Sequence, residues 1–188
     1  MKEMNRREFL TLTGAAVVAL SLAGCGGPSA PPAPPAVPTG KEAELLAAIN
    51  KVWKEKFNAN LVDHEQLTLN QEAQGAIKIQ GGIFEDAKES VHTLTTKDIE
   101  KLGGITAWEY TMKSKYELGG AAGVSEPSSE GEISLTFEYS CEDAVVQKFV
   151  DKILDYSLSR KAEFISIYCP VVQSTTYMIA TVFWNKMA

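Results

Sequence analysis

Apolar positions recur every three or four residues in several stretches of the chain, and this spacing predicts four helices. The first lies in ELLAAINKVWKEKF, residues 44–57, and the second covers about 65–80, ending at a pair of glycines. A short third helix is expected at 95–102, again followed by two glycines. The fourth begins at Ser140 and presents an apolar face between Val145 and Leu154. Four amphipathic helices need a common apolar surface to pack on.

Strict alternation of apolar and polar residues predicts two half-buried strands, WEYTMKSKYEL at 108–118 and EISLTFEY at 132–139. The Gly-, Ser- and Glu-rich segment 119–131 is expected to connect them as a mobile loop. EFISIYC at 163–169 and TTYMIATVFWN at 175–185 are apolar on both faces, as expected of central strands covered by helices. This order of elements predicts an α/β (α+β) fold, in which helices pack on a mixed β-sheet as an αβα sandwich.

Residues 1–24 have the layout of an export signal. The apolar run from Phe9 to Gly24, about sixteen residues, is shorter than the roughly twenty that a membrane span needs. Arg6-Arg7, followed by Glu8-Phe9-Leu10, resembles the twin-arginine export signal. Leu22-Ala23-Gly24-Cys25 resembles a bacterial lipobox, whose cysteine becomes the lipid-modified N-terminus. We therefore expect a cell-membrane lipoprotein, anchored through Cys25 and facing the extracytoplasmic side.

The segment after Cys25 predicts a tether between the anchor and a folded domain. GGPSAPPAPPAVPTG consists largely of Pro, Gly and Ala and carries no charge, so residues 25–40 favour an extended spacer. Residues 41–188 are the size of one domain with its own core. Three of the 18 basic and two of the 24 acidic residues precede Phe9, which leaves 15 and 22 in the mature chain, a formal charge of −7. This charge opposes binding to nucleic acid.

Cysteine usage leaves one question open. With Cys25 assigned to the lipobox, Cys141 and Cys169 remain, an even pair in a domain expected to be exported. A disulfide between them is permitted, and two buried free thiols are the other interpretation. Neither cysteine has the spacing of a metal site, and the sequence contains no C-x-x-C motif. We expect no cofactor and no metal.

The order of elements and several local patterns resemble the CAP superfamily (cysteine-rich secretory proteins, antigen 5 and pathogenesis-related 1), also called SCP-like. LLAAINKVWKEKF resembles the opening helix of the family, with Trp53 where arginine is usual, and LTLNQEAQGAIKI resembles its second helix. SVHT, with His92, is similar to the segment that carries the first cavity histidine, and Glu109 falls at the family's glutamate position. SCEDAVVQKFVDKILDYSLSRKAEFI and TTYMIATVFW resemble the later helix and the closing strand.

The resemblance implies a candidate cavity formed by His92, Glu109 and Arg160. In the family this cavity holds two histidines with acidic partners and can bind a divalent metal. Here Arg160 or Ser159 stands where the second histidine is expected, so the metal-ligand set is incomplete. For His92 itself, the alternative is an ordinary turn histidine.

We therefore expect a domain without catalytic residues that binds a small apolar ligand or a cell-envelope partner. The alternative is a metal-dependent hydrolase or peptidase that uses His92 and Glu109. A serine hydrolase site is not indicated, because the sequence contains no G-x-S-x-G motif.

Overall fold

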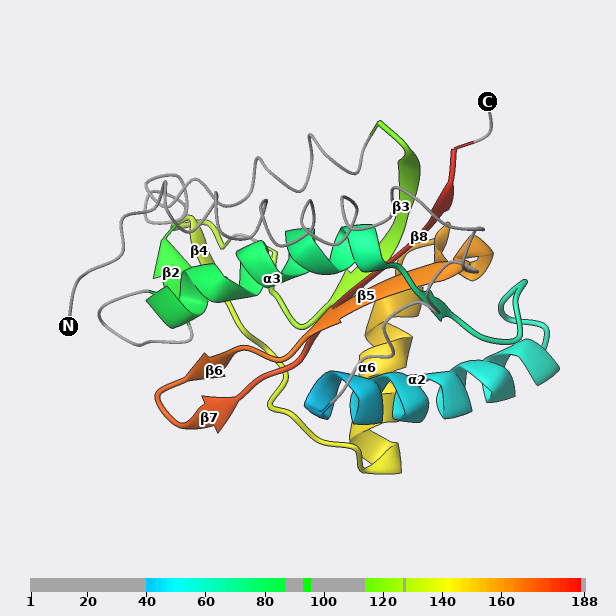
Figure 1. Ribbon diagram of the computed structural model, residues 1–188, viewed down its shortest axis with the longest axis horizontal. Coiled ribbons are helices and arrows are strands. Elements are labelled where there is room, and N and C mark those ends of the chain that lie inside the picture. The colour runs from blue at the N-terminus through cyan, green and yellow to red at the C-terminus, as the bar shows by residue number, and fades with distance from the viewer. Residues whose placement is uncertain (1–39, 87–92, 96–113, 127, 187–188) are drawn as a thin grey trace, which may run out of the picture. The chain divides into compact units, whose positions relative to one another are not determined.

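The computed structural model describes residues 40–86, 93–95, 114–126 and 128–186, and within them the chain folds as three α-helices, a short 3-10 helix and a mixed four-stranded sheet (Figure 1). These residues belong to one compact unit, Val37–Ala188. The signal, the tether and the predicted third helix lie outside the described residues, apart from Gly40 and Thr95. None of the helices in the described ranges is long and apolar enough to cross a membrane.

The main sheet has the strand order β1-β5-β8-β3. Strand β1 (Thr68–Leu69) runs parallel to β5 (Phe164–Tyr168), and β5 is antiparallel to β8 (Ile179–Asn185). Strand β3 (Tyr116–Ala122) pairs antiparallel with the other edge of β8. One parallel and two antiparallel pairings make this a mixed sheet, so the predicted α+β fold is confirmed.

Two small sheets extend this core. Strand β2 (Thr93–Thr95) pairs antiparallel with β4 (Glu132–Ser134). Strands β6 (Val171–Val172) and β7 (Thr175–Thr176) form a hairpin. Both residues of its turn, Gln173 and Ser174, have positive φ, as two-residue hairpins with the right twist require.

Helices cover the two faces of the main sheet. Helices α2 (Lys41–Asn58) and α6 (Asp143–Leu154) pack on one face, where their apolar side chains share a core with Ile165 and Ile167 of β5. Helix α3 (Gln71–Asp86) packs on the other face, against Phe183 and Ile179 of β8 (Figure 1). Because successive strand residues point to opposite faces, β5 and β8 contribute to both cores. This explains why their sequences are apolar on both sides.

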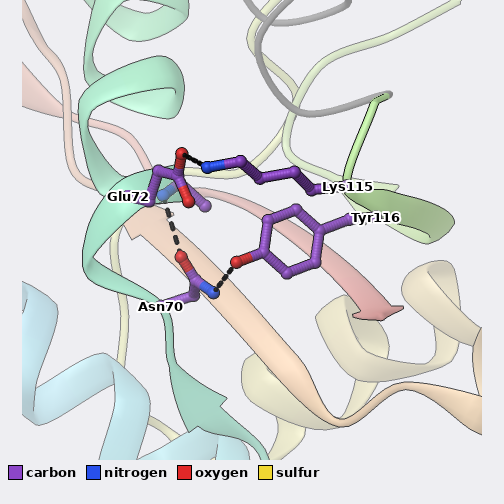
Figure 2. A network of polar contacts seen from close by, with 5 residues as sticks. Asn70, Glu72, Lys115 and Tyr116 are labelled. Atoms are coloured by element: carbon purple, nitrogen blue, oxygen red, sulfur yellow. Dashed lines mark hydrogen bonds and ion pairs between the residues drawn. The ribbon is translucent and has the colours of Figure 1, made fainter. Parts of the chain in front are cut away.

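Helix α3 is held to the sheet by side-chain amides. Asn70, just before the helix, accepts a hydrogen bond from the Ala73 N–H at 3.0 Å and donates to the Tyr116 hydroxyl at 3.0 Å (Figure 2). Two residues after Asn70, Glu72 pairs with Lys115. Gln74 exchanges two hydrogen bonds with the backbone of Ile167 on β5, at 2.7 and 3.0 Å. These contacts fix where the helix starts and how it lies on the strand.

The structure moves several element boundaries relative to the sequence prediction; the strand expected at 132–139, for example, is regular only over β4 and continues as isolated bridges at Leu135 and Glu138. The second helix begins at Gln71 rather than near 65, because Asn70 caps it. The fourth begins at Asp143 rather than Ser140. The segment 119–131 was expected to be a loop, yet residues 119–122 continue β3. A side chain at Gly120 would meet the Ile153 carbonyl at 2.4 Å, so glycine permits this close approach of strand and helix.

Candidate functional site

Arg160 is the one residue of the predicted cavity that the described ranges contain. It lies in the 3-10 helix η1 (Ser159–Lys161), and its guanidinium donates to Asp63 Oδ1 from Nη2 at 2.8 Å and from Nε at 3.2 Å. The Arg160 side chain is 56% exposed and the Asp63 side chain is 41% exposed. The hydrogen bond from Arg160 lowers the pKa of the Asp63 carboxyl. Arg160 thus has a carboxylate partner that the sequence did not suggest.

His92 and Glu109 lie outside the described residues, so the proposed meeting of these two side chains with Arg160 stays a prediction. Cys25, the expected lipidation site, lies outside them as well. Within the described ranges, no three His, Cys, Asp or Glu side chains gather in a way that could hold a metal ion.

A surface hollow of about 410 Å³ lies beside Arg160, where helices α2 and α6 end. Its walls come from the end of α2 and the residues after it, from the last turns of α6, and from the turn that leads into η1. The lining residues are Lys56, Leu61, Asp151, Leu154, Asp155, Tyr156, Ser157, Ser159 and Arg160. The hollow exists because both helices stop here and the connecting chain turns back over their ends.

The turn from Tyr156 to Ser159, which lines the hollow, is held in place by hydrogen bonds and by packing against β3. The buried Ser159 donates from its hydroxyl to the Tyr156 carbonyl, and its N–H donates to the same oxygen at 3.0 Å. A side chain at Gly120 would lie 3.3 Å from Cβ of Ser159 and from Cδ2 of Tyr156, so the strand backs directly on this turn. The turn is therefore fixed by packing and by hydrogen bonds, which favours a preformed site.

The charged residues of the lining are all engaged in ion pairs. Lys56 pairs with Asp151 at 2.6 Å, and Asp155 pairs with Lys152 at 3.0 Å. Arg160 pairs with Asp63. A charge already neutralised by a partner is a poor nucleophile or general base, because the partner stabilises its charged form. This arrangement suits binding better than acid–base or nucleophilic chemistry.

Large apolar side chains are exposed around the same hollow. Leu61 is 54% exposed and Tyr156 is 40% exposed, and both are lining residues. Leu158, two residues after Tyr156, is 52% exposed. An apolar group that entered the hollow would remove the exposed surfaces of Leu61 and Tyr156 from water, which is favourable at about 25 cal/mol per Å².

Leu61, Tyr156 and Leu158 were not predicted as site residues from the sequence. A signal was present: DYSLSRK places a tyrosine and a leucine in a polar turn after the apolar face of a helix has ended. Such residues cannot reach the core from a surface turn, so the local sequence already indicated that they are exposed. The position of Leu61 opposite them depends on the packing of α2 against α6 and has no local signal.

Both remaining thiols are free in the structure. Cys141 is exposed, and its Sγ donates to the Tyr139 hydroxyl at 3.4 Å. Cys169 is buried, and burial raises the pKa of its thiol to about 12. The structure therefore has two free thiols and no disulfide between Cys141 and Cys169, although only Cys169 is buried.

Comparison with known proteins identifies no relative: no family model, curated protein or solved structure matches the chain. The resemblance to the CAP superfamily therefore remains a prediction from the sequence.

Proposed function

We propose that this chain is a lipid-anchored extracytoplasmic domain of CAP-like type that binds a small apolar ligand or a cell-envelope component and does not catalyse a reaction. The observation that carries the proposal is the hollow at the ends of α2 and α6, where Leu61 and Tyr156 are exposed beside charges that are already paired. Its volume of about 410 Å³ falls in the range of small-molecule sites.

The paired charges also indicate what the ligand is like. Lys56 and Asp151, both in the lining, pair with each other, and the lining residue Arg160 pairs with Asp63 in the loop after α2. The pairs cancel, so the site has no strong preference for a cation or an anion. A mainly apolar ligand satisfies such a site, since it gains from contact with Leu61, Leu154 and Tyr156 without having to break an ion pair.

The anchor belongs to the same proposal. The twin-arginine pair, the lipobox ending at Cys25 and the Pro-rich tether precede α2, which begins at Lys41. A tethered domain samples ligands near the membrane, where apolar molecules are concentrated. The alternative, metal-dependent hydrolysis through His92 and Glu109, depends on residues outside the described ranges, and no observation within them favours it.

The binding proposal is tested by titrating the full chain with anilinonaphthalene sulfonate, a fluorescent anion whose aromatic rings bind apolar surfaces, and following backbone amide shifts by NMR. We expect saturable shifts at residues 154–160 and at Leu61. Tyr156→Ser and Leu61→Ser should each weaken this binding by about tenfold, which corresponds to 1.4 kcal/mol of lost apolar contact.

Val171→Ser provides the matched control, because Val171 is 50% exposed and lies in the β6–β7 hairpin, outside the lining. This variant should bind the probe as the unmodified chain does. Shifts that appear elsewhere, or that persist unchanged in Tyr156→Ser and Leu61→Ser, would contradict the proposal. The amide readout separates binding in the hollow from any binding to the apolar leader.

A further inference from the structure

Three segments of the chain run side by side at the N-terminal end of α2. The Tyr139 N–H donates to the Thr176 carbonyl at 2.8 Å, and the Met178 N–H donates to the Phe137 carbonyl at 3.0 Å. From the other side, the Tyr177 N–H donates to the Pro170 carbonyl at 2.8 Å. The segment before Cys141 and the segment after Cys169 are thus joined to the same stretch, residues 176–178.

The first turn of α2 contacts both cysteine-bearing segments. The Tyr139 hydroxyl donates to Glu44 Oε2 at 2.8 Å, and the Cys169 N–H donates to Glu42 Oε1 at 3.3 Å. Lys41 Nζ lies 5.2 Å from the centre of the Tyr139 ring and donates to Thr176 Oγ1 at 2.6 Å. One helical turn therefore contacts Cys169 directly and also contacts Tyr139, whose hydroxyl accepts the hydrogen bond from Cys141.

The two thiols differ in exposure, and the pKa of one of them is raised. The Cys141 thiol is at the surface and donates to the Tyr139 hydroxyl, whereas Cys169 is buried. Burial is the main cause of the raised pKa of Cys169, and the charges of Glu42 and Cys141 raise it further. The charge of Cys141 thus acts on the Cys169 thiol, as expected of groups close in space.

We propose that Cys141 and Cys169 are an oxidisable thiol pair that closes into a disulfide at the N-terminal ends of α2 and α6. The oxidant is a small-molecule or protein disulfide, for which oxidised glutathione stands in below. The Cys141 thiol loses its proton, and the thiolate attacks one sulfur of glutathione disulfide and releases one glutathione thiolate. Cys169 then loses its proton, attacks the Cys141 sulfur and releases the second glutathione thiolate. The protein gives up two protons and two electrons, and the oxidant becomes two thiols.

The bond would brace the part of the domain nearest its anchor. The tether ends at Gly40, and α2 begins at the next residue, so any pull on the lipid reaches the domain at this turn. A disulfide would join the start of α6 to the end of β5 on either side of it. That this disulfide persists in the cell rests on the proposed export, since structural disulfides persist in oxidising compartments. The chemistry itself does not depend on export or on the ligand of the hollow.

The test uses the full chain with Cys25→Ser, so that Cys141 and Cys169 are the only thiols present. The reduced, folded protein is incubated with oxidised glutathione, unfolded, treated with iodoacetamide and weighed by intact-protein mass spectrometry. We expect a product that has lost two hydrogens and carries neither an alkyl group nor glutathione. The second step should accelerate by about tenfold per pH unit, because the Cys169 thiol, with its pKa of about 12, is almost fully protonated at neutral pH.

Two controls decide whether the fold brings the thiols together. Cys169→Ser should stop at a glutathione adduct on Cys141. In glutathione redox buffers, the disulfide of the folded chain should form at a ratio of oxidised to reduced glutathione at least tenfold lower than the ratio that the same chain needs in urea. Two alkylated thiols after oxidation, a lasting glutathione adduct with Cys169 still free, or equal bond stability in folded and unfolded chains would each overturn the proposal. None of these results depends on whether the hollow binds a ligand.

Discussion

Arg160 and Asp63 are joined both through their side chains and through their backbones. The guanidinium donates to the carboxylate at 2.8 Å, and the Asp63 N–H donates to the Arg160 carbonyl, also at 2.8 Å. The loop after α2 is therefore fastened to η1, which forms one side of the hollow. The arginine that stands where the family resemblance expects a histidine thus closes the wall of a candidate binding site.

The stability that the Arg160–Asp63 ion pair contributes should depend on pH. Arg160 lowers the pKa of Asp63 below its ordinary value of 3.8, so the pair contributes stability above that pH and loses it as the pH falls through the folded-state pKa. Arg160→Ala should raise the pKa of Asp63 toward 3.8. The melting temperature at neutral pH should hardly change, because both side chains are exposed and solvent screens them. An NMR titration of the Asp63 carboxyl measures the shift, and an unchanged pKa in Arg160→Ala would show that the pair does not form in solution.

Glycine substitutions in β3 and α3 should have opposite effects on stability. Gly120→Ala places a methyl group 2.4 Å from the Ile153 carbonyl, so the strand and α6 must move apart, at a cost of about 1–3 kcal/mol. Gly75→Ala lies within α3 with nothing inside 4 Å, and it should stabilise by about 0.5–1 kcal/mol. Urea unfolding curves compare the two. Because Gly120 backs on Tyr156 and Ser159, its alanine variant should also weaken probe binding in the hollow, whereas Gly75→Ala should leave it intact.

The cap of α3 is expected to be worth more than the hydrogen bond to Tyr116. Asn70→Ala removes the acceptor for the Ala73 N–H and should cost about 1 kcal/mol, within the 0.5–2 kcal/mol found for helix caps. Tyr116→Phe removes only the acceptor of the Asn70 amide (Figure 2) and keeps the ring contacts with Phe164 and Phe183, so it should cost less. Thermal unfolding of the two single variants and of the double variant checks this. A larger loss in Tyr116→Phe would mean that Asn70 serves the sheet rather than the helix.

Local sequence patterns were sufficient to predict the parts of this fold whose cause is local. The apolar periodicity of α2 and the two-sided apolar strands β5 and β8 were predicted because each reflects burial along a single element. The extension of β3 through Gly119 and Gly120 was missed. Glycine is needed there because the backbone passes close to Val182 and Ile153, which are distant in sequence. The partner of Arg160 was missed for the same reason: Asp63 precedes it by almost a hundred residues.

Anchoring can be tested independently of the fold. Cys25→Ala should remove the acceptor of the lipid and leave an exported precursor that is not labelled by radioactive palmitate. Arg6→Lys together with Arg7→Lys should retain the chain in the cytoplasm, because the twin-arginine pathway requires the arginine pair. Metabolic labelling and cell fractionation follow the two variants. Labelling that persists in Cys25→Ala would contradict the lipobox prediction, and continued export of the double-lysine variant would point to the general secretion pathway.

The two thiols of the reduced domain should react with alkylating agents at very different rates. Cys141 is exposed, so iodoacetamide at about pH 8 should modify it within minutes in the folded Cys25→Ser chain. Cys169 is 7% exposed and has a thiol pKa of about 12, so it should react only when the chain unfolds. Peptide mapping after partial alkylation identifies the modified residue, and Cys141→Ser should show no fast phase. Rapid modification of Cys169 in the folded chain would mean that the end of β5 opens without global unfolding, and that burial does not protect this thiol.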